Sequence, residues 1–260
     1  MNHSILLRVD PFVVGMFLFF AMILMVLLGK IAGRKWNKEG IEPKGGMNSL
    51  FTALFALSGL ILAFTFGMSQ SRLERVRAVV EDEVNDIGTA VLRSDLYTDS
   101  IREGFRNDFR KYAEAVIAYY DNAGNAHVMQ QSKGDATKAG EGLWARATQQ
   151  SKLPNMLIPS NLMIPALNDM FDIAQTREIV LNSRVPDLVE WMLFVCVLVT
   201  CFIGGFTSSA FAGREWIIII GFAIVTSMVV YTTIDLSRPF SGMIRVDAGQ
   251  QAIVELRKMF

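Results

Sequence analysis

The sequence has few of the residues that enzymes use to bind metals or attack substrates. Its 260 residues include two histidines, His3 and His127, and two cysteines, Cys196 and Cys201. It contains no HExxH, CxxC, GxGxxG, GxSxG or Walker-type motif. The two cysteines fall within one apolar run, where small packing residues are the favoured interpretation. We therefore expect no catalytic residue, no metal site and no cofactor, and an enzyme is disfavoured.

A net charge is absent as well. The 25 Lys and Arg residues balance the 25 Asp and Glu residues. A protein that binds nucleic acid needs a basic excess to neutralise phosphates, and this chain has none. Nucleic acid is therefore not expected as a partner.

Uncharged runs of about 20 residues, the length that spans a bilayer, are the main feature of the chain. Hydrophobic residues make up 52% of the sequence, and the mean hydropathy is positive. The four uncharged runs are residues 11–29, 47–68, 191–213 and 216–234. We expect an all-α membrane protein with four transmembrane helices, two within residues 1–68 and two within residues 190–234.

A soluble segment, residues 69–189, separates the two pairs of helices, and residues 235–260 form a C-terminal tail. An even number of spans places this segment and both termini on the same side of the membrane. Lys and Arg occur in the loops of both sides, so the positive-inside rule leaves the orientation open.

The soluble segment is expected to be mostly helical. Apolar residues continue the second span at helical spacing, which predicts one rod of about 45 residues. They are Leu73, Val76, Val80, Val84, Ile87 and Val91. A second helix is predicted over residues 101–119, and a third over residues 164–183 with Pro165 in its first turn. Residues 121–142 are rich in Gly, Asn, Gln and Lys and are predicted to form a mobile surface loop or a hairpin-like insertion.

An acidic run on the predicted rod has two interpretations. Glu81, Asp82, Glu83 and Asp86 could form a cation site or a solvated helix face. Adjacent residues of a helix point in different directions, so the solvated face is favoured.

Small residues at four-residue spacing in the spans also have two interpretations. The two sets are Gly59, Ala63 and Gly67, and Gly204, Ser208 and Ala212, the second with Gly205, Ser209 and Gly213 beside it. Close packing within one chain and association between copies explain them equally well.

An apolar ladder runs beside the first of these sets. Ala56, Leu60 and Phe64 repeat every four residues. If several copies surrounded an axis, this ladder could form a hydrophobic constriction of the kind that gates by dewetting.

Two motifs give the chain a family resemblance. Phe64, Ser69, Arg72, Val84 and Asn85 match the spacing of the second helix of bestrophins. The chain departs from that pattern after Arg72, where bestrophins have an aromatic pair and this chain has Leu-Glu. The chain more closely resembles the bacterial bestrophin-like family. That resemblance rests on the segment from Glu83 to Thr89 and on a closing segment containing Asp235, Arg238, Pro239, Gly242, Ile244, Arg245 and Val246.

The resemblance implies a homo-oligomeric channel, pentameric and mostly for anions in bestrophins, whose second helices line an apolar neck. Carried over by position, Ala56, Leu60 and Phe64 would form the neck, and the smaller Ala56 would widen it. The expected partners are other copies of the chain, the lipid bilayer and permeating ions, with chloride as a candidate.

The resemblance also favours a multi-pass protein of the bacterial inner membrane with cytoplasmic termini. In the closing segment, an ion pair between Asp235 and Arg238 is expected, and a structural clasp is favoured there over an ion site. The alternative function is a non-conducting membrane scaffold or signalling adaptor that binds a partner through the soluble segment.

Overall fold

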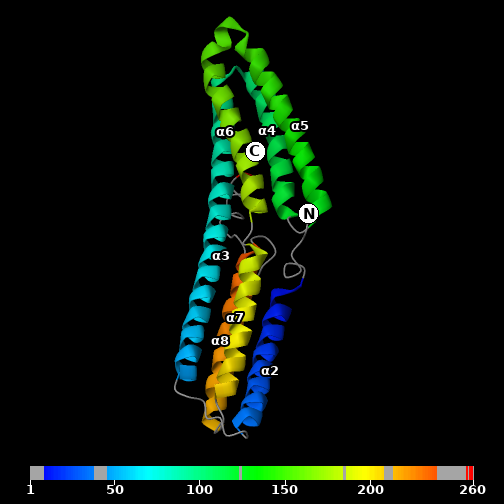
Figure 1. Cartoon of the computed structure of the whole chain (residues 1–260). Helices are drawn as coiled ribbons and strands as arrows, with labels where there is room; N and C mark the ends of the chain where they lie inside the picture. Colours follow the sequence, from blue (N-terminus) through cyan, green and yellow to red (C-terminus); the bar gives the residue numbers. More distant parts are fainter. Residues whose placement is uncertain are drawn as a thin grey trace. The chain divides into compact units, whose positions relative to one another are not determined.

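The structure is a computed structural model of the chain (Figure 1). It describes residues 9–37, 46–122, 125–183, 186–207, 213–238, 256, 258 and 259. Almost all of these residues are helical, and none of them forms a β-strand. The chain divides into two compact units. The first, termed the membrane unit, is residues 1–72 and 184–238; the second, termed the helical unit, is residues 73–183 and 239–260.

The membrane unit contains α2 (Pro11–Asn37), the first part of α3 (Gly46–Arg93), α7 (Asp187–Thr207) and α8 (Gly213–Leu236). Within the described residues, four helices are long and apolar enough to cross a membrane. They are Pro11–Trp36, Phe51–Leu96, Leu188–Thr207 and Trp216–Leu236. The predicted all-α fold with four membrane-spanning helices is confirmed, although the first helix continues several residues beyond its predicted end. The third helix begins at Asp187, before its predicted start, and Gly213, its predicted last residue, begins α8.

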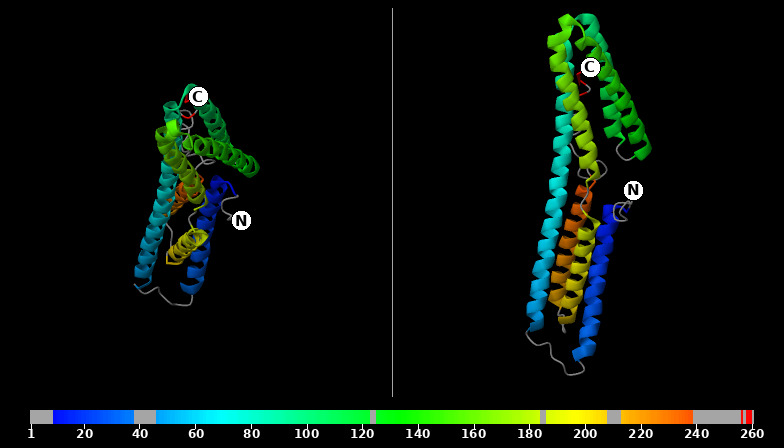
Figure 2. Two further views of the ribbon diagram at one scale, coloured as in Figure 1. Left: turned by 90° about the horizontal axis from the view of Figure 1, so that it is seen from above. Right: turned by 45° about the horizontal axis from the view of Figure 1, so that its top comes forward.

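Glycines bring α2 and α7 into close contact. Figures 1 and 2 show these helices side by side. A Cβ atom added to Gly29 would lie 2.0 Å from the carbonyl oxygen of Phe202, and one added to Gly205 would lie 2.1 Å from that of Val26. Only glycine allows the backbones to approach so closely. A Cβ atom added to Gly204 would lie 2.9 Å from the ring of Phe51 on α3. For Gly204 and Gly205, the structure therefore supports packing within one chain; Ser208 and Ala212 lie outside the described residues.

Helix α3 is one continuous helix of 48 residues, which confirms the predicted rod. It contains no proline and contributes residues to both units. Its end coincides with Ser94, whose hydroxyl donates to the carbonyl of Val91 at 2.6 Å. A serine hydroxyl that bonds a nearby carbonyl competes with the backbone N–H groups for the hydrogen bonds of the helix. A short 3₁₀ turn, η1 (Ser94–Leu96), follows.

The helical unit combines the second part of α3 with α4 (Asp99–Asp121), α5 (Ala126–Ser151), η2 (Pro154–Met156) and α6 (Leu157–Asn182). Helix α4 confirms the predicted second helix, with Phe105 and Phe109 fully buried. The core also contains Val84 and Ile87 of α3, Leu167 and Met170 of α6, and Leu256 near the C-terminus. Figures 1 and 2 show α4 and α5 as a neighbouring pair.

The predicted loop over residues 121–142 is wrong, because most of it belongs to α5. Asn125 caps this helix by accepting hydrogen bonds from the backbone N–H groups of His127 and Val128. The buried face of α5 consists mainly of small residues, which a hydrophobicity pattern does not reveal. It comprises Ser132, Ala136, Gly140, Leu143 and Ala147. The side chain of His127 is exposed.

The predicted start of the third soluble helix is also wrong. Helix α6 begins at Leu157, after a 3₁₀ turn with Pro154 in its first positions, and Pro165 lies inside the helix. An internal proline removes one backbone hydrogen bond and costs about 3 kcal/mol. Complete burial of Met163 and Leu167 on either side of Pro165 offsets that cost.

Candidate pore-lining face of α3

Within the membrane unit, polar side chains on one face of α3 bind α7. The hydroxyl of Ser58 lies 2.8 Å from that of Thr200 and 3.2 Å from the sulfur of Cys196, both on α7. Ser58 and Thr200 are almost fully buried. Hydrogen bonds between apolar helices are directional, so this cluster fixes which face of α3 points into the bundle.

Arg72 attaches α3 to the end of α8. Its guanidinium donates to the carbonyl of Ser237 at 2.7 Å, and the Ser237 hydroxyl lies 3.3 Å from that of Ser69. The last carbonyls of a helix lack intrahelical donors and carry partial negative charge, so a cation is favourable there. Arg72, which the bestrophin resemblance singled out, thus caps α8 in this structure.

The predicted neck residues lie on a different face of α3. Leu60 follows Ser58 by two residues, about 200° around the helix. Its side chain is 52% exposed, and that of Phe64 is 64% exposed, while Ala56 is exposed as well. The three side chains therefore form a continuous apolar ladder that points away from the bundle.

The small residues of α3 have no packing partner among the described residues of the membrane unit. A Cβ atom added to Gly59 or Gly67 would meet no atom within 4 Å, and Ala63 is exposed. Gly205 of α7 differs, because it packs directly on the backbone of α2. The stripe on α3 is thus left uncovered by the helices that the structure describes in the membrane unit.

A buried charged cluster occupies the helical unit. Glu83 of α3 has no exposed surface, and Arg177 of α6 is 4% exposed. One carboxylate oxygen of Glu83 accepts from Arg177 at 2.5 Å, and the other accepts from the Tyr120 hydroxyl at 2.5 Å. The guanidinium of Arg177 also lies 4.4 Å from the ring centre of Tyr119. The predicted solvated face is therefore wrong for Glu83, which is a buried hydrogen-bonded anion.

The phenol groups around Glu83 remain protonated. Burial raises the pKa of the Tyr120 hydroxyl well above its ordinary value, and the negative charge of Glu83 raises it further. Burial raises the pKa of Tyr119 to about 12, with a further contribution from Glu178. Burial alone would lower the pKa of Arg177, but the adjacent Glu83 raises it above the usual range. Tyr120 is thus a neutral donor, and Arg177 is a permanent cation.

Sequence reasoning missed Arg177 and Tyr120. A signal for Arg177 was present, because it continues the apolar stripe of α6, three residues after Ala174 and four before Leu181. A charged residue at a buried position of a helix requires a partner of opposite charge.

The remaining residues of the two sequence motifs do not converge on one site. Asn85 and Thr89 are exposed on α3, away from the buried Glu83. At the end of α8, Asp235 is buried, and Arg238 donates to the carbonyl of Val9 at 2.6 Å. Pro239, Gly242 and Arg245 lie outside the described residues. Among the residues that the structure does describe, no three metal-binding side chains lie together.

Comparison with known proteins identifies the family. The model of the bestrophin-like domain matches residues 15–250. The chain belongs to the bestrophin-like family. A comparison with curated proteins gives no match.

Solved structures of bestrophin homologues share the fold. A mutant of a bacterial bestrophin homologue from Klebsiella pneumoniae is 14% identical, with a TM-score of 0.71 over 94% of this chain and 98% of that chain. Another mutant of that homologue is 16% identical, with a TM-score of 0.66 over 93% of this chain and 98% of that chain. The bestrophin-like fold and family suggest an ion channel of the bestrophin type.

Proposed function

We propose that this bestrophin-like protein is a homo-oligomeric, pentameric anion channel in which copies of α3 surround an apolar neck. Ala56, Leu60 and Phe64 line that neck. The supporting observation is the orientation of α3, whose polar face is bound to its own bundle while the apolar ladder points away from it.

The open stripe of small residues supports assembly through α3. It lies beside the ladder on the same helix, so a neighbouring copy that packs on Gly59 and Gly67 would hold the two ladders near a common axis. Each copy would contribute the same contacts around a closed ring.

The neck controls conduction by its width and its lack of charge. No charged residue occurs in α3 between Gly46 and Ser71. A narrow apolar segment has a high energy for a hydrated ion, and the barrier falls when the segment widens and fills with water. In this proposal the bacterial inner membrane holds the channel, the helical unit and the termini are cytoplasmic, and chloride is a permeant ion.

Recordings from the purified oligomer in planar bilayers test the proposal. In a chloride gradient, the wild-type current should reverse near the equilibrium potential of chloride. Leu60→Ala and Phe64→Ala should raise the single-channel conductance by widening the neck, and Ala56→Leu should lower it. Phe17→Ala on α2 removes an exposed aromatic ring outside the ladder and should leave the conductance unchanged.

Two results would contradict the proposal. The first is the absence of current from intact oligomers. The second is unchanged conductance in all three neck variants, which would show that the current does not pass through the ladder of α3.

A further inference from the structure

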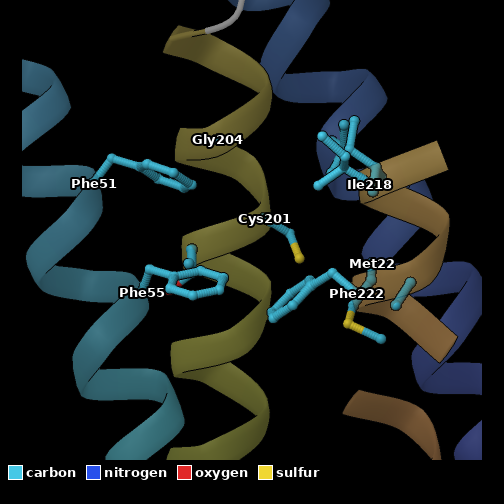
Figure 3. Close-up of a pocket in the computed structure, with 11 residues that line it drawn as sticks. Met22, Phe51, Phe55, Cys201, Gly204, Ile218 and Phe222 are labelled. Carbon is cyan, nitrogen blue, oxygen red and sulfur yellow. The ribbon is translucent and has the colours of Figure 1, made fainter. Parts of the chain in front are cut away.

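Side chains from the four helices of the membrane unit line an open apolar hollow of about 290 Å³. Figure 3 shows side chains from all four helices directed into it, among them Met22 of α2, Phe55 of α3, Cys201 of α7 and Phe222 of α8. The hollow extends to Met22, which is only 1% exposed. Its edge includes Ile218, which is 72% exposed, so the hollow opens at the surface of the bundle.

Unequal helix packing accounts for the hollow. Glycines allow the backbones of α2 and α7 to pack in direct contact. Phenylalanine rings, in contrast, separate α3 from α7 and α8. The ring centres of Phe55 and Phe222 are 5.1 Å apart, and the ring of Phe51 fills the space above Gly204. Phenylalanine spacers on one side and glycine contacts on the other leave a volume that the side chains of the described residues do not fill.

The hollow lacks free polar groups. Thr200, its one hydroxyl-bearing residue, donates to the carbonyl of Cys196 at 2.8 Å and also bonds Ser58. None of the described residues that line it is charged. Apolar cavities stay dry, and an engineered cavity of about 150 Å³ with a comparable lining binds benzene. This hollow is roughly twice as large and therefore suits an apolar chain rather than water or an ion.

We propose that the hollow binds one acyl chain of a bilayer phospholipid. The lining residues belong to the membrane-crossing helices, so hydrocarbon is the surrounding medium at the opening. A flexible chain of methylenes can pass the exposed edge at Ile218 and reach the buried surface of Met22. A side chain from a second copy would have to cross the same depth from outside the bundle. Each buried methylene adds favourable transfer and dispersion energy.

Photolabelling in membranes tests this binding site. The full-length protein is reconstituted into phosphatidylethanolamine and phosphatidylglycerol vesicles that contain a phosphatidylcholine with a diazirine on one acyl chain. After illumination, mass spectrometry locates the labelled residues. The wild type should carry label on the buried Met22 and Cys201, in addition to lipid-exposed positions such as Met228.

Two adjacent residues of α8 provide a matched pair of variants. Ile217 and Ile218 are both 72% exposed, but only Ile218 lines the hollow. Ile218→Trp should obstruct the opening and reduce labelling of Met22 relative to Met228 by about tenfold, the effect of losing roughly two buried methylenes. Ile217→Trp should leave that ratio unchanged.

The wild-type result decides the proposal even if a variant fails to fold. Label on Met228 without label on Met22 or Cys201 would overturn the acyl-chain site. Label on Met22 that appears only after the oligomer is dissociated would also overturn it, because a second copy would then fill the hollow. Neither outcome depends on whether the protein conducts ions.

Discussion

Replacement of Arg177 by methionine should strongly destabilise the helical unit. The change leaves Glu83, which has no exposed surface, without its cationic partner, although Tyr120 still donates to it. Removing one member of a buried ion pair costs about 3–5 kcal/mol, because the remaining charge stays desolvated. That cost corresponds to an increase of roughly two to three and a half orders of magnitude in local opening.

Hydrogen exchange of the full-length protein measures this opening segment by segment. Amides around Val84 and Leu167 should exchange faster in Arg177→Met, by roughly two to three and a half orders of magnitude. Arg102→Met is the control, because Arg102 pairs with Asp99, whose side chain is 93% exposed, and a surface pair contributes about 0–1 kcal/mol.

A double variant separates loss of the pair from loss of packing. In Glu83→Gln combined with Arg177→Met, no unpaired charge remains, so the total destabilisation should be smaller than the sum of the single changes. Equal exchange in Arg177→Met and Arg102→Met, or strict additivity in the double variant, would refute the role assigned to the buried pair.

Two further predictions concern packing and charge. Gly205→Ala should disrupt the membrane unit and lower its melting temperature in detergent, because the new Cβ would lie 2.1 Å from the Val26 carbonyl oxygen. Gly221→Ala should be neutral or stabilising, because its Cβ would have no atom of the described residues within 4 Å. Equal effects of the two changes would contradict the packing argument. The pKa of Asp86 is raised by burial and by two nearby aspartates, so its ionisation opposes folding as the pH rises through that pKa. Asp86→Asn should therefore stabilise the helical unit at pH 7 in chemical denaturation, with a gain that disappears in acid; a variant less stable at pH 7 would contradict this.

The spans and the long α3 could be predicted because each produces a local pattern in the sequence. An uncharged run of about 20 residues is enough to indicate a transmembrane helix, and α3 has no proline to interrupt it. Helix α5 was missed for the opposite reason. Its buried face uses Ala136, Gly140 and Ala147, whose small side chains give little hydrophobic contrast.

The charged cluster required information that no local pattern contains. Glu83 belongs to an acidic run typical of a solvated face, and its partner Arg177 lies 94 residues away. The ladder of Ala56, Leu60 and Phe64 was visible from its spacing. Its direction became clear only from the bond between Ser58 and Thr200, 142 residues apart, which fixes the opposite face of α3.

Access of water to Phe64 tests the pore assignment most directly. In a protein whose native Cys196 and Cys201 are replaced by alanine, Phe64→Cys would be exposed to a charged, water-soluble methanethiosulfonate during bilayer recording. The current should fall irreversibly, because the reagent reacts in the aqueous path and adds a bulky charge to the neck. Phe17→Cys on α2 should give no change. Current that persists in Phe64→Cys, with the thiol still unmodified in the recovered oligomer, would show that this face of α3 does not line the conducting path.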